Sequence, residues 1–270
     1  MPGLSLITLN IANPSVERAE KQLEWLAGRP EDVLVLTETK ASDGCRHLAD
    51  AFRAAGYAVT YPEPGPGEYG VMIVSKLATQ PDPITRELTY LPTRATGVTI
   101  TTDRGQVRVL GAYVPSRDAS PEKVERKRRW LAEFSAALGT AAPDVSTLFL
   151  GDFNVLEPTH EPRYAFFQQF EYDFYRDLAD QHGLVDAFRH VHPEQVDHSW
   201  VGRTGDGYRY DHAHCTKDLA AELVDCEYVH EPRLSRLSDH SALTVRLTCS
   251  GTSPLLTSDP VEATSPPTLF

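Results

Sequence analysis

Apolar runs separated by helical patterns are the feature that most constrains the fold of this chain. The run VLVLT at 33–37 has no polar alternation, which is typical of a strand buried on both faces. An apolar, β-branched run at 4–11 precedes it, and a helical pattern from Val16 to Leu26 lies between the two. A second helix is expected at 43–55, where Gly56 ends it. The chain therefore opens in the order strand, helix, strand, helix.

The rest of the chain continues this alternation and adds paired strands. Asp103 to Gly105 is a tight-turn signal between two strand-like runs, so we expect those strands to be antiparallel. The Pro- and Gly-rich segment 62–70 predicts no regular structure. Further strands are expected at 70–75, 95–102, 107–114, 145–150, 223–229 and 241–248, and further helices at 121–138 and 164–182.

This order of elements favours a single domain with two sheets and with helices outside them, over residues 1–249. Residues 250–270 differ from the rest of the chain in composition. They hold four prolines and eight Ser or Thr residues without periodicity. We therefore expect a disordered tail there.

Charge and cysteine content narrow the class of protein. The chain has 26 Lys and Arg against 38 Asp and Glu, and the net charge of −12 argues against attachment to nucleic acid or anionic membrane by bulk positive charge. The four cysteines form no Cys-x-x-Cys pair, which indicates buried thiols in a reducing compartment. No run reaches the roughly 18 apolar residues of a membrane span. Because residues 1–11 lack the features of a signal peptide, we expect a cytoplasmic protein without membrane contact.

Polar side chains follow the apolar runs at five separate places. Loops at the strand ends of α/β sheets converge, so these side chains can meet in one cleft. Each of them alone also has a structural interpretation, such as a turn cap or a solvated acid. A cluster of carboxylate and amide oxygens suits Mg²⁺ or Mn²⁺ and is a poor zinc site. The residues are Asn10, Glu38, Asp152, Asn154, Asp211, Asp239 and His240.

The same residues lie in motifs that resemble a known family. LNI, LTET, AYVP, GDFN, YRYDH and SDHSAL occur in this order between residues 8 and 243. The ordered set is similar to the motifs of the endonuclease/exonuclease/phosphatase superfamily. Three further segments, GEYGVMIVSK at 67–76, EKVERKRRWL at 122–131 and HGLVDAFRHVHPE at 182–194, resemble its exonuclease III-like branch, which includes abasic-site endonucleases. The resemblance implies a four-layer α/β sandwich, in which two packed mixed β-sheets are flanked by helices.

The resemblance also implies a divalent metal, Mg²⁺ or alternatively Mn²⁺, and hydrolysis of a phosphoester. By this resemblance Glu38 binds the metal directly, and Asn10 and Asp239 are its further partners. Ala12 stands where members of the branch usually carry a second acidic metal partner.

Catalytic roles follow from the same resemblance. Asp152 would orient or deprotonate the attacking water, and Asn154 would hold that water or a phosphoryl oxygen. His240 would donate hydrogen bonds to the phosphoryl oxygens, with Asp211 orienting its imidazole and favouring the protonated form. Tyr113 would contact the phosphate or help the leaving group.

Candidate substrate contacts come from four further side chains. Arg126 and Arg129 lie in the basic segment 122–131 and can contact a phosphate backbone, although a solvated helical face balanced by glutamates is the alternative. Trp200 and Tyr208 are candidate substrate-binding aromatics. The sequence departs from abasic-site enzymes here, because Ser199 and Tyr208 stand where those enzymes usually show aromatic or tryptophan pocket residues.

We therefore expect a monomeric, Mg²⁺-dependent DNA nuclease of DNA repair that acts as a 3′–5′ exonuclease, as an abasic-site endonuclease, or as both. The tyrosine of AYVP favours nucleic acid, because relatives acting on other phosphoesters usually carry histidine in this motif. Two alternatives stay open. The same metal site can act on RNA, a small nucleotide or a phospholipid-type phosphoester, which the net charge of −12 favours. A non-catalytic binding module is the other, and the complete set of motifs argues against it.

Overall fold

The first of two mixed sheets contains the first strand and the last strand of the described residues. The computed structural model describes residues 3–140 and 145–263. In the first sheet the six strands lie in the order β13 (Leu223–Val229), β14 (Ala242–Leu247), β1 (Ser5–Asn10), β2 (Val33–Thr39), β4 (Gly70–Ser75) and β3 (Ala58–Thr60).

The second sheet packs face to face on the first. Its order is β5 (Thr79–Pro81), β6 (Ala95–Thr102), β7 (Gly105–Tyr113), β8 (Ser146–Asp152), β12 (Asp211–Thr216) and β9 (Leu184–Asp186). The expected antiparallel pairing of β6 with β7 is confirmed. A separate hairpin joins β10 (Trp200–Val201) and β11 (Gly207–Tyr208).

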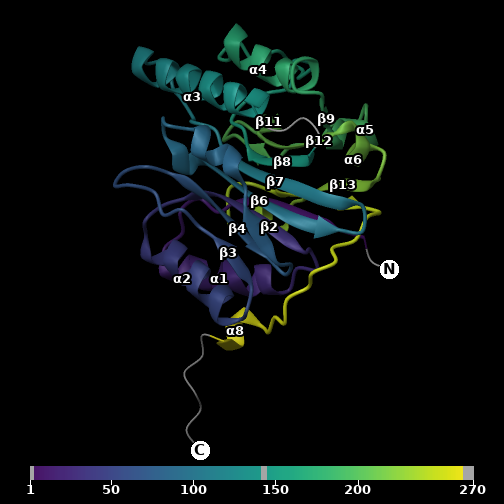
Figure 1. Cartoon of the computed structure of the whole chain (residues 1–270). Helices are drawn as coiled ribbons and strands as arrows, with labels where there is room; N and C mark the ends of the chain where they lie inside the picture. Colours follow the sequence, from purple (N-terminus) through teal and green to yellow (C-terminus); the bar gives the residue numbers. More distant parts are fainter. Residues whose placement is uncertain (1–2, 141–144, 264–270) are drawn as a thin grey trace, which may run out of the picture.

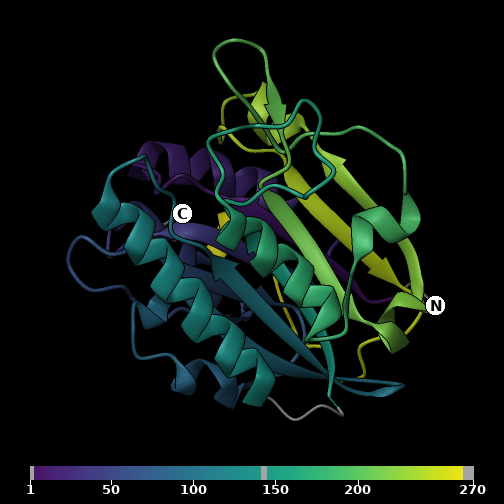
Figure 2. The ribbon, with the colours of Figure 1, turned by 90° about the horizontal axis from the view of Figure 1, so that it is seen from above.

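Helices form the two outer layers (Figure 1). Two of them, α1 (Val16–Ala27) and α2 (Asp43–Ala54), cover the first sheet, and two others, α3 (Pro121–Thr140) and α4 (Gln169–Asp180), cover the second. Seen from above, α3 and α4 lie across the strands of the second sheet (Figure 2). The four-layer α/β sandwich implied by the resemblance is thereby confirmed. Shorter elements are η1 (Pro83–Glu87), η2 (Pro92–Arg94), α5 (Ala187–Val191), α6 (Lys217–Ala220), α7 (Glu231–Leu234) and α8 (Pro260–Ala263).

Burial of apolar side chains between the layers holds the sandwich together. Val35 and Leu150 belong to the cluster between the two sheets, and Phe52 belongs to the cluster under α1 and α2. In the third cluster, Trp130 of α3 stacks on Phe134 with ring centroids 5.0 Å apart. All four cysteines are free and buried, as expected. None of the helices in the described residues is long and apolar enough to cross a membrane.

Two parallel strand pairs place the candidate residues at one edge of the sandwich. In the first sheet β1 runs parallel to β2, so Asn10 pairs with Thr37, next to Glu38. In the second sheet β7 runs parallel to β8, so Tyr113 pairs with Asp152. Because the carboxyl ends of parallel strands lie at the same edge, both sheets deliver their polar ends to one place.

The helix expected at 164–182 is shorter than predicted. It begins only at Gln169, after an N-terminal capping box formed by Gln168 and Glu171. The preceding residues 164–168 form a turn instead. The rings of Phe166 and Phe167 pack against the Arg117 guanidinium, which removes them from the helical pattern that their spacing indicated.

The disorder expected at 250–270 does not hold for residues 250–263. Gly251 and Pro254 form β-bridges with Thr102 and Leu77, and α8 packs against α1 and α2. The segment runs down the side of the sandwich to α8 (Figure 1). Its order comes from backbone hydrogen bonds to neighbouring strands and loops, which leave no periodic signal in a sequence. Residues 264–270 lie outside the described residues.

Candidate active site

Glu38 projects from a strained bulge near the end of β2. Its backbone φ is +58°, in the left-handed region that residues other than glycine rarely adopt. The register between β2 and β4 shifts between Thr37 and Thr39, so Glu38 is the extra residue. Bulges re-aim side chains, and backbone strain of this kind clusters at functional sites. The bulge interrupts the regular pairing of β2 with β4 and thereby sets the direction of the Glu38 carboxylate.

Asn10 connects the carboxylates of the two sheets. Its Nδ2 donates to Glu38 Oε2 and to Asp152 Oδ2, each at 2.9 Å. Its Oδ1 accepts from the backbone N–H of Ala12 at 2.8 Å. Both amide hydrogens and the amide oxygen of this buried side chain are therefore engaged. The structure shows Asn10, predicted as a metal partner, orienting both acids through hydrogen bonds.

Tyr113 supports Glu38 from the second sheet. Its hydroxyl donates to Glu38 Oε2 at 3.0 Å. Burial and the nearby carboxylates of Glu38 and Asp152 raise the pKa of Tyr113 far above its ordinary value, because they oppose a phenolate. The hydroxyl therefore keeps its proton and continues to donate this hydrogen bond.

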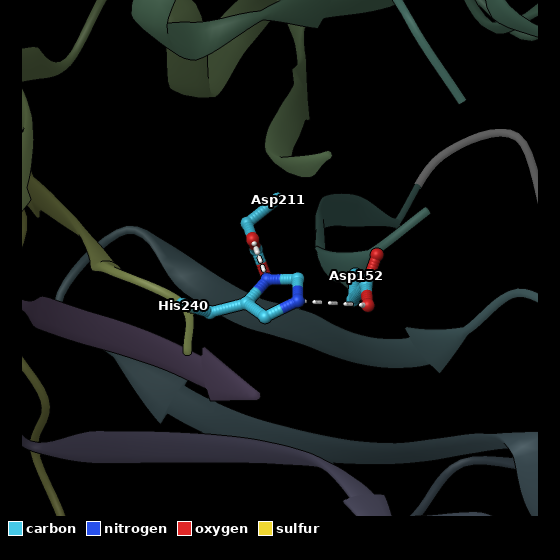
Figure 3. A group of neighbouring side chains, drawn as sticks. All are labelled: Asp152, Asp211 and His240. Atoms are coloured by element: carbon cyan, nitrogen blue, oxygen red, sulfur yellow. Dashed lines mark hydrogen bonds and ion pairs between the residues drawn. The ribbon is translucent and has the colours of Figure 1, made fainter. Parts of the chain in front are cut away.

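Asp152, Asp211 and His240 lie side by side (Figure 3). Asp152 is the last residue of β8, Asp211 is the first residue of β12, and His240 lies just before β14. His240 Nδ1 lies 2.6 Å from Asp211 Oδ2, and His240 Nε2 lies 4.0 Å from Asp152 Oδ2. Burial opposes a charge on His240, but Asp211 outweighs it and raises the pKa of His240 to about 10. Burial and the Asp211 charge raise the pKa of Asp152 to about 7. At neutral pH the imidazole is therefore cationic, and Asp152 can take up a proton.

Asn154 is fixed by three hydrogen bonds beside Asp152. It has a positive φ of 49°, and its N–H donates to Asp152 Oδ1 at 2.9 Å. Its Nδ2 donates to the Val114 carbonyl at 3.0 Å, and its own carbonyl accepts from Lys127 Nζ at 2.5 Å. Among the residues that the structure describes, its side-chain oxygen and one amide hydrogen have no partner, so both can contact a substrate.

Lys127 and Arg94 are two buried cations near the site; sequence reasoning missed Arg94, and it placed Lys127 in the basic segment 122–131 without its burial. Lys127 is buried and also pairs with Glu171 at 2.7 Å. A signal existed, since the helical period places it on the same face as Trp130 and Phe134. Arg94 is 2% exposed and donates to the Tyr113 carbonyl at 3.2 Å, with its guanidinium over the Tyr113 ring. No pattern in the sequence distinguishes Arg94 from other arginines.

Asp239, Trp200 and Tyr208 lie at the rim of the site. The exposed Asp239 accepts a hydrogen bond from Trp200 Nε1 at 3.2 Å, and Trp200 forms a β-bridge with His240. Among the described residues, no hydrogen bond or ion pair joins Asp239 to Glu38. Tyr208 lies with its ring centroid 5.8 Å from that of Trp200 and is nearly parallel to Tyr210. The aromatic residues therefore flank the catalytic candidates.

The two predicted arginines of α3 do not contact these residues. Arg126 is half-buried and donates to the Ser116 carbonyl at 3.0 Å. Arg129 is exposed, and its guanidinium lies 4.0 Å from the centroid of the Tyr90 ring. Their proposed role is therefore limited to a substrate that extends along α3.

Two sets of side chains can be compared as holders of a metal ion. Asp152, Asp211 and His240 offer ligand atoms within 4.8 Å of one another. A protonated imidazole does not bind a metal, however, and His240 is closely paired with Asp211. Among the described residues, nothing donates a hydrogen bond to Glu38 Oε1, because Asn10 and Tyr113 both use Oε2. Glu38 therefore fits a hard divalent cation better.

Comparisons with known proteins agree with the four-layer fold. A model of the "Endonuclease/Exonuclease/phosphatase family" matches residues 7–240. An AP endonuclease structure from Archaeoglobus fulgidus is 25% identical, with a TM-score of 0.74, over 90% of this chain and 99% of that one. A 3′-5′ exonuclease from Neisseria meningitidis is 27% identical, with a TM-score of 0.74 and the same coverage. A Neisseria 3′ phosphatase bound to a product DNA hairpin is 26% identical, with a TM-score of 0.75, again over 90% and 99%. No curated protein sequence matches the chain.

Proposed function

The chain belongs to the endonuclease/exonuclease/phosphatase family, and from this premise we propose that it is a Mg²⁺-dependent nuclease that hydrolyses phosphodiester bonds of DNA. Mn²⁺ is expected to substitute for Mg²⁺. The reaction would be 3′–5′ exonuclease cleavage, incision at an abasic site, or both.

One observation carries this proposal. A chain of hydrogen bonds links Tyr113, Glu38, Asn10 and Asp152, and the imidazole of His240 lies 4.0 Å from the last of these. A half-buried carboxylate that can hold a cation thus lies beside a buried carboxylate with a raised pKa and a buried, cationic imidazole. These are the components that phosphoryl transfer needs, because it depends on positioning and on neutralising charge.

Glu38 would hold the metal ion, with Asp239 reaching it from the rim. Bound there, the ion would supply a positive charge that polarises the phosphoryl oxygens. Asn10 and Tyr113 hold Glu38 through its Oε2 and so leave Oε1 for the ion. Carboxylate oxygens are the ligands that Mg²⁺ prefers.

The remaining residues would act directly on the substrate. Asp152, held by Asn10 and by the backbone of Asn154, would accept the proton of the attacking water. His240 would donate from Nε2 to a phosphoryl oxygen, while Asp211 holds Nδ1 and keeps the ring protonated. Asn154 would orient the water or a phosphoryl oxygen with its free side-chain oxygen and amide hydrogen.

DNA is the substrate that the similarities favour. One similar structure is named an AP endonuclease, one a 3′-5′ exonuclease, and one is bound to a DNA hairpin. Trp200 and Tyr208 would contact bases or sugars at the rim, and Arg126 and Arg129 would contact the backbone along α3. We further propose that the protein acts in DNA repair, as a monomer in the cytoplasm. The buried, free cysteines are compatible with that reducing compartment.

An assay with two end-labelled duplexes tests the proposal. One duplex carries a single abasic site and the other a recessed 3′ end, and each is incubated with Mg²⁺, with Mn²⁺ or with EDTA. Metal-dependent cleavage is expected, and the product pattern separates incision from 3′ trimming. If both duplexes survive, the proposal fails for DNA. The same metal site is then tested on RNA, nucleotides and phospholipid esters, which the net charge of −12 favours.

A further inference from the structure

A hollow beside the candidate active site is lined by three arginines. Its volume is about 630 Å³, and its lining includes Arg18 from α1, Arg233 from α7, and Arg236 just after α7. Ala12, Ser238 and Asp239, which lie close to Asn10 or His240 in the sequence, also line the hollow. None of the function proposed above uses these arginines.

The three guanidinium groups lack carboxylate partners. Arg18 donates to the backbone carbonyls of Ala12 and Asn13, and Arg233 donates from Nε to Ser241 Oγ at 3.1 Å. Within residues 3–140 and 145–263, no salt bridge to Asp or Glu forms at any of the three. Asp239 also lines the hollow, but its carboxylate accepts from Trp200. Three positive charges against one negative charge leave the hollow positive in a chain whose net charge is −12.

The hollow borders the candidate catalytic residues. Asp239 directly precedes His240, and the N–H of Ala12 bonds the side chain of Asn10. Ser238, another lining residue, donates from Oγ to the Asn10 carbonyl and accepts from the His240 N–H at 3.1 Å. A phosphate next to the scissile phosphate at His240 can therefore reach this hollow, since phosphates repeat with every nucleotide.

Ala12 is uncharged, so it does not repel an anionic ligand from the hollow. Its methyl group leaves the wall next to Arg18 uncharged, with the backbone φ of Ala12 at +51°. A carboxylate at this position would lie against the same arginines and cancel their field. Guanidinium groups bind phosphate through paired N–H donors, which an ammonium group cannot match.

We propose that this hollow is a second phosphate subsite, which binds a phosphate of the substrate strand adjacent to the one that is cleaved. The inference rests on the proposed nuclease function and names where the strand lies. It assigns to Arg233 and Arg236 the binding of substrate without a part in the chemical step. Arg18 both lines the subsite and holds the loop of Ala12 and Asn13.

Binding of a labelled single-stranded oligodeoxynucleotide to the full chain in EDTA tests this directly. The variants are Arg233→Gln and Arg236→Asn, the latter chosen because Asn tolerates the positive φ of 61° at this position. Arg53→Gln, on the outer face of α2, is the matched control with the same change of charge. Each subsite variant should weaken binding by about tenfold and reduce the slope of log Kd against log salt by about 1, while the control changes neither. Affinity and slope equal to the control in both variants would overturn the proposal.

Turnover of bis(para-nitrophenyl) phosphate separates this inference from the proposed function. This small diester has no second phosphate, so its kcat/KM should be the same in the wild type and in both subsite variants. A fall in kcat/KM for this small diester as large as the loss of DNA affinity would overturn the subsite, because it would show that the substitutions damage the catalytic residues themselves. If the wild type binds DNA through the arginines but cleaves none, the nuclease fails and the subsite stands. If the wild type cleaves DNA and both variants bind DNA normally, the nuclease function stands and the subsite proposal fails.

Discussion

The side-chain nitrogen of Asn10 lies 2.9 Å from a carboxylate oxygen of Asp152, although 142 residues separate them in sequence. The contact joins the end of β1 in one sheet to the end of β8 in the other. The same nitrogen also donates to Glu38 Oε2. The relative position of the Glu38 and Asp152 carboxylates is therefore set by one buried amide.

Replacing Asn10 should disconnect the two acids. In Asn10→Ala the carboxylates of Glu38 and Asp152 lose their common donor and repel each other, so we expect kcat/KM to fall by about 10². The concentration of Mg²⁺ that gives half-maximal activity should rise in parallel. Steady-state kinetics across a Mg²⁺ titration measure both, and wild-type values for both would refute the orienting role.

The Asp211–His240 pair predicts a pH effect. Asp211 raises the pKa of His240, so the imidazolium persists until the pH approaches about 10. In Asp211→Asn the charge is lost while burial still opposes protonation, so the pKa of His240 should fall. The alkaline limb of the pH–rate profile should therefore move to lower pH in this variant. An unchanged alkaline limb would contradict the assignment.

Asp152 predicts a stability effect in metal-free protein. Its folded pKa is raised from 3.8 to about 7, so the folded state holds this proton more tightly than the unfolded state. Stability from Asp152 is present below pH 3.8 and is lost as the pH rises to about 7. Relative to wild type, Asp152→Asn should gain about 1.4 kcal/mol of unfolding free energy per pH unit in this window. Urea unfolding in EDTA at several pH values measures it, and a constant difference between the two proteins would contradict the shift.

The buried charges behind Asn154 predict a large structural effect. Glu171 is fully buried and pairs with Lys127 at 2.7 Å and with Arg117 at 2.5 Å. Glu171→Ala leaves two buried cations unpaired, and we expect a loss of about 3–5 kcal/mol in unfolding free energy. The exposed Glu122 of α3 provides the control, since Glu122→Ala should change stability by less than about 0.5 kcal/mol. Equal losses of unfolding free energy in the two variants would contradict a stabilising role of the buried ion pairs of Glu171.

The long strands and helices could be predicted from sequence because apolar runs of five or more residues, such as VLVLT at 33–37, indicate burial directly. The short strands β9, β10 and β11 have two or three residues each, which is too few for a periodic pattern. In β12 the buried residues include His212 and His214, so a core strand reads as a polar segment. The order of residues 250–263 depends on backbone pairing, which no side-chain pattern records.

The sequence predicts where the site lies, but it does not predict which side-chain atoms bond to each other within it. The motifs place Asn10, Glu38, Tyr113 and Asp152 at strand ends, and the structure brings these four into one hydrogen-bonded chain. Whether Asn10 binds a metal or orients its neighbours depends on which atoms already have partners. The bond between Asp239 and Trp200 likewise depends on how the β10–β11 hairpin folds over the site. Packing between residues far apart in the sequence decides the partners of Asn10 and of Asp239, and sequence motifs do not record that packing.

The most direct test of the account compares cleavage and binding of a 3′-recessed duplex by the wild type and by Asp152→Asn, with Mg²⁺ and with EDTA. The account predicts that wild-type cleavage requires Mg²⁺. It also predicts that Asp152→Asn lowers kcat by about 10² or more with little change in Kd, because Asp152 acts mainly in the transition state. Cleavage that persists in EDTA, or a variant that loses binding and rate equally, would contradict the proposed roles of the metal site and of Asp152.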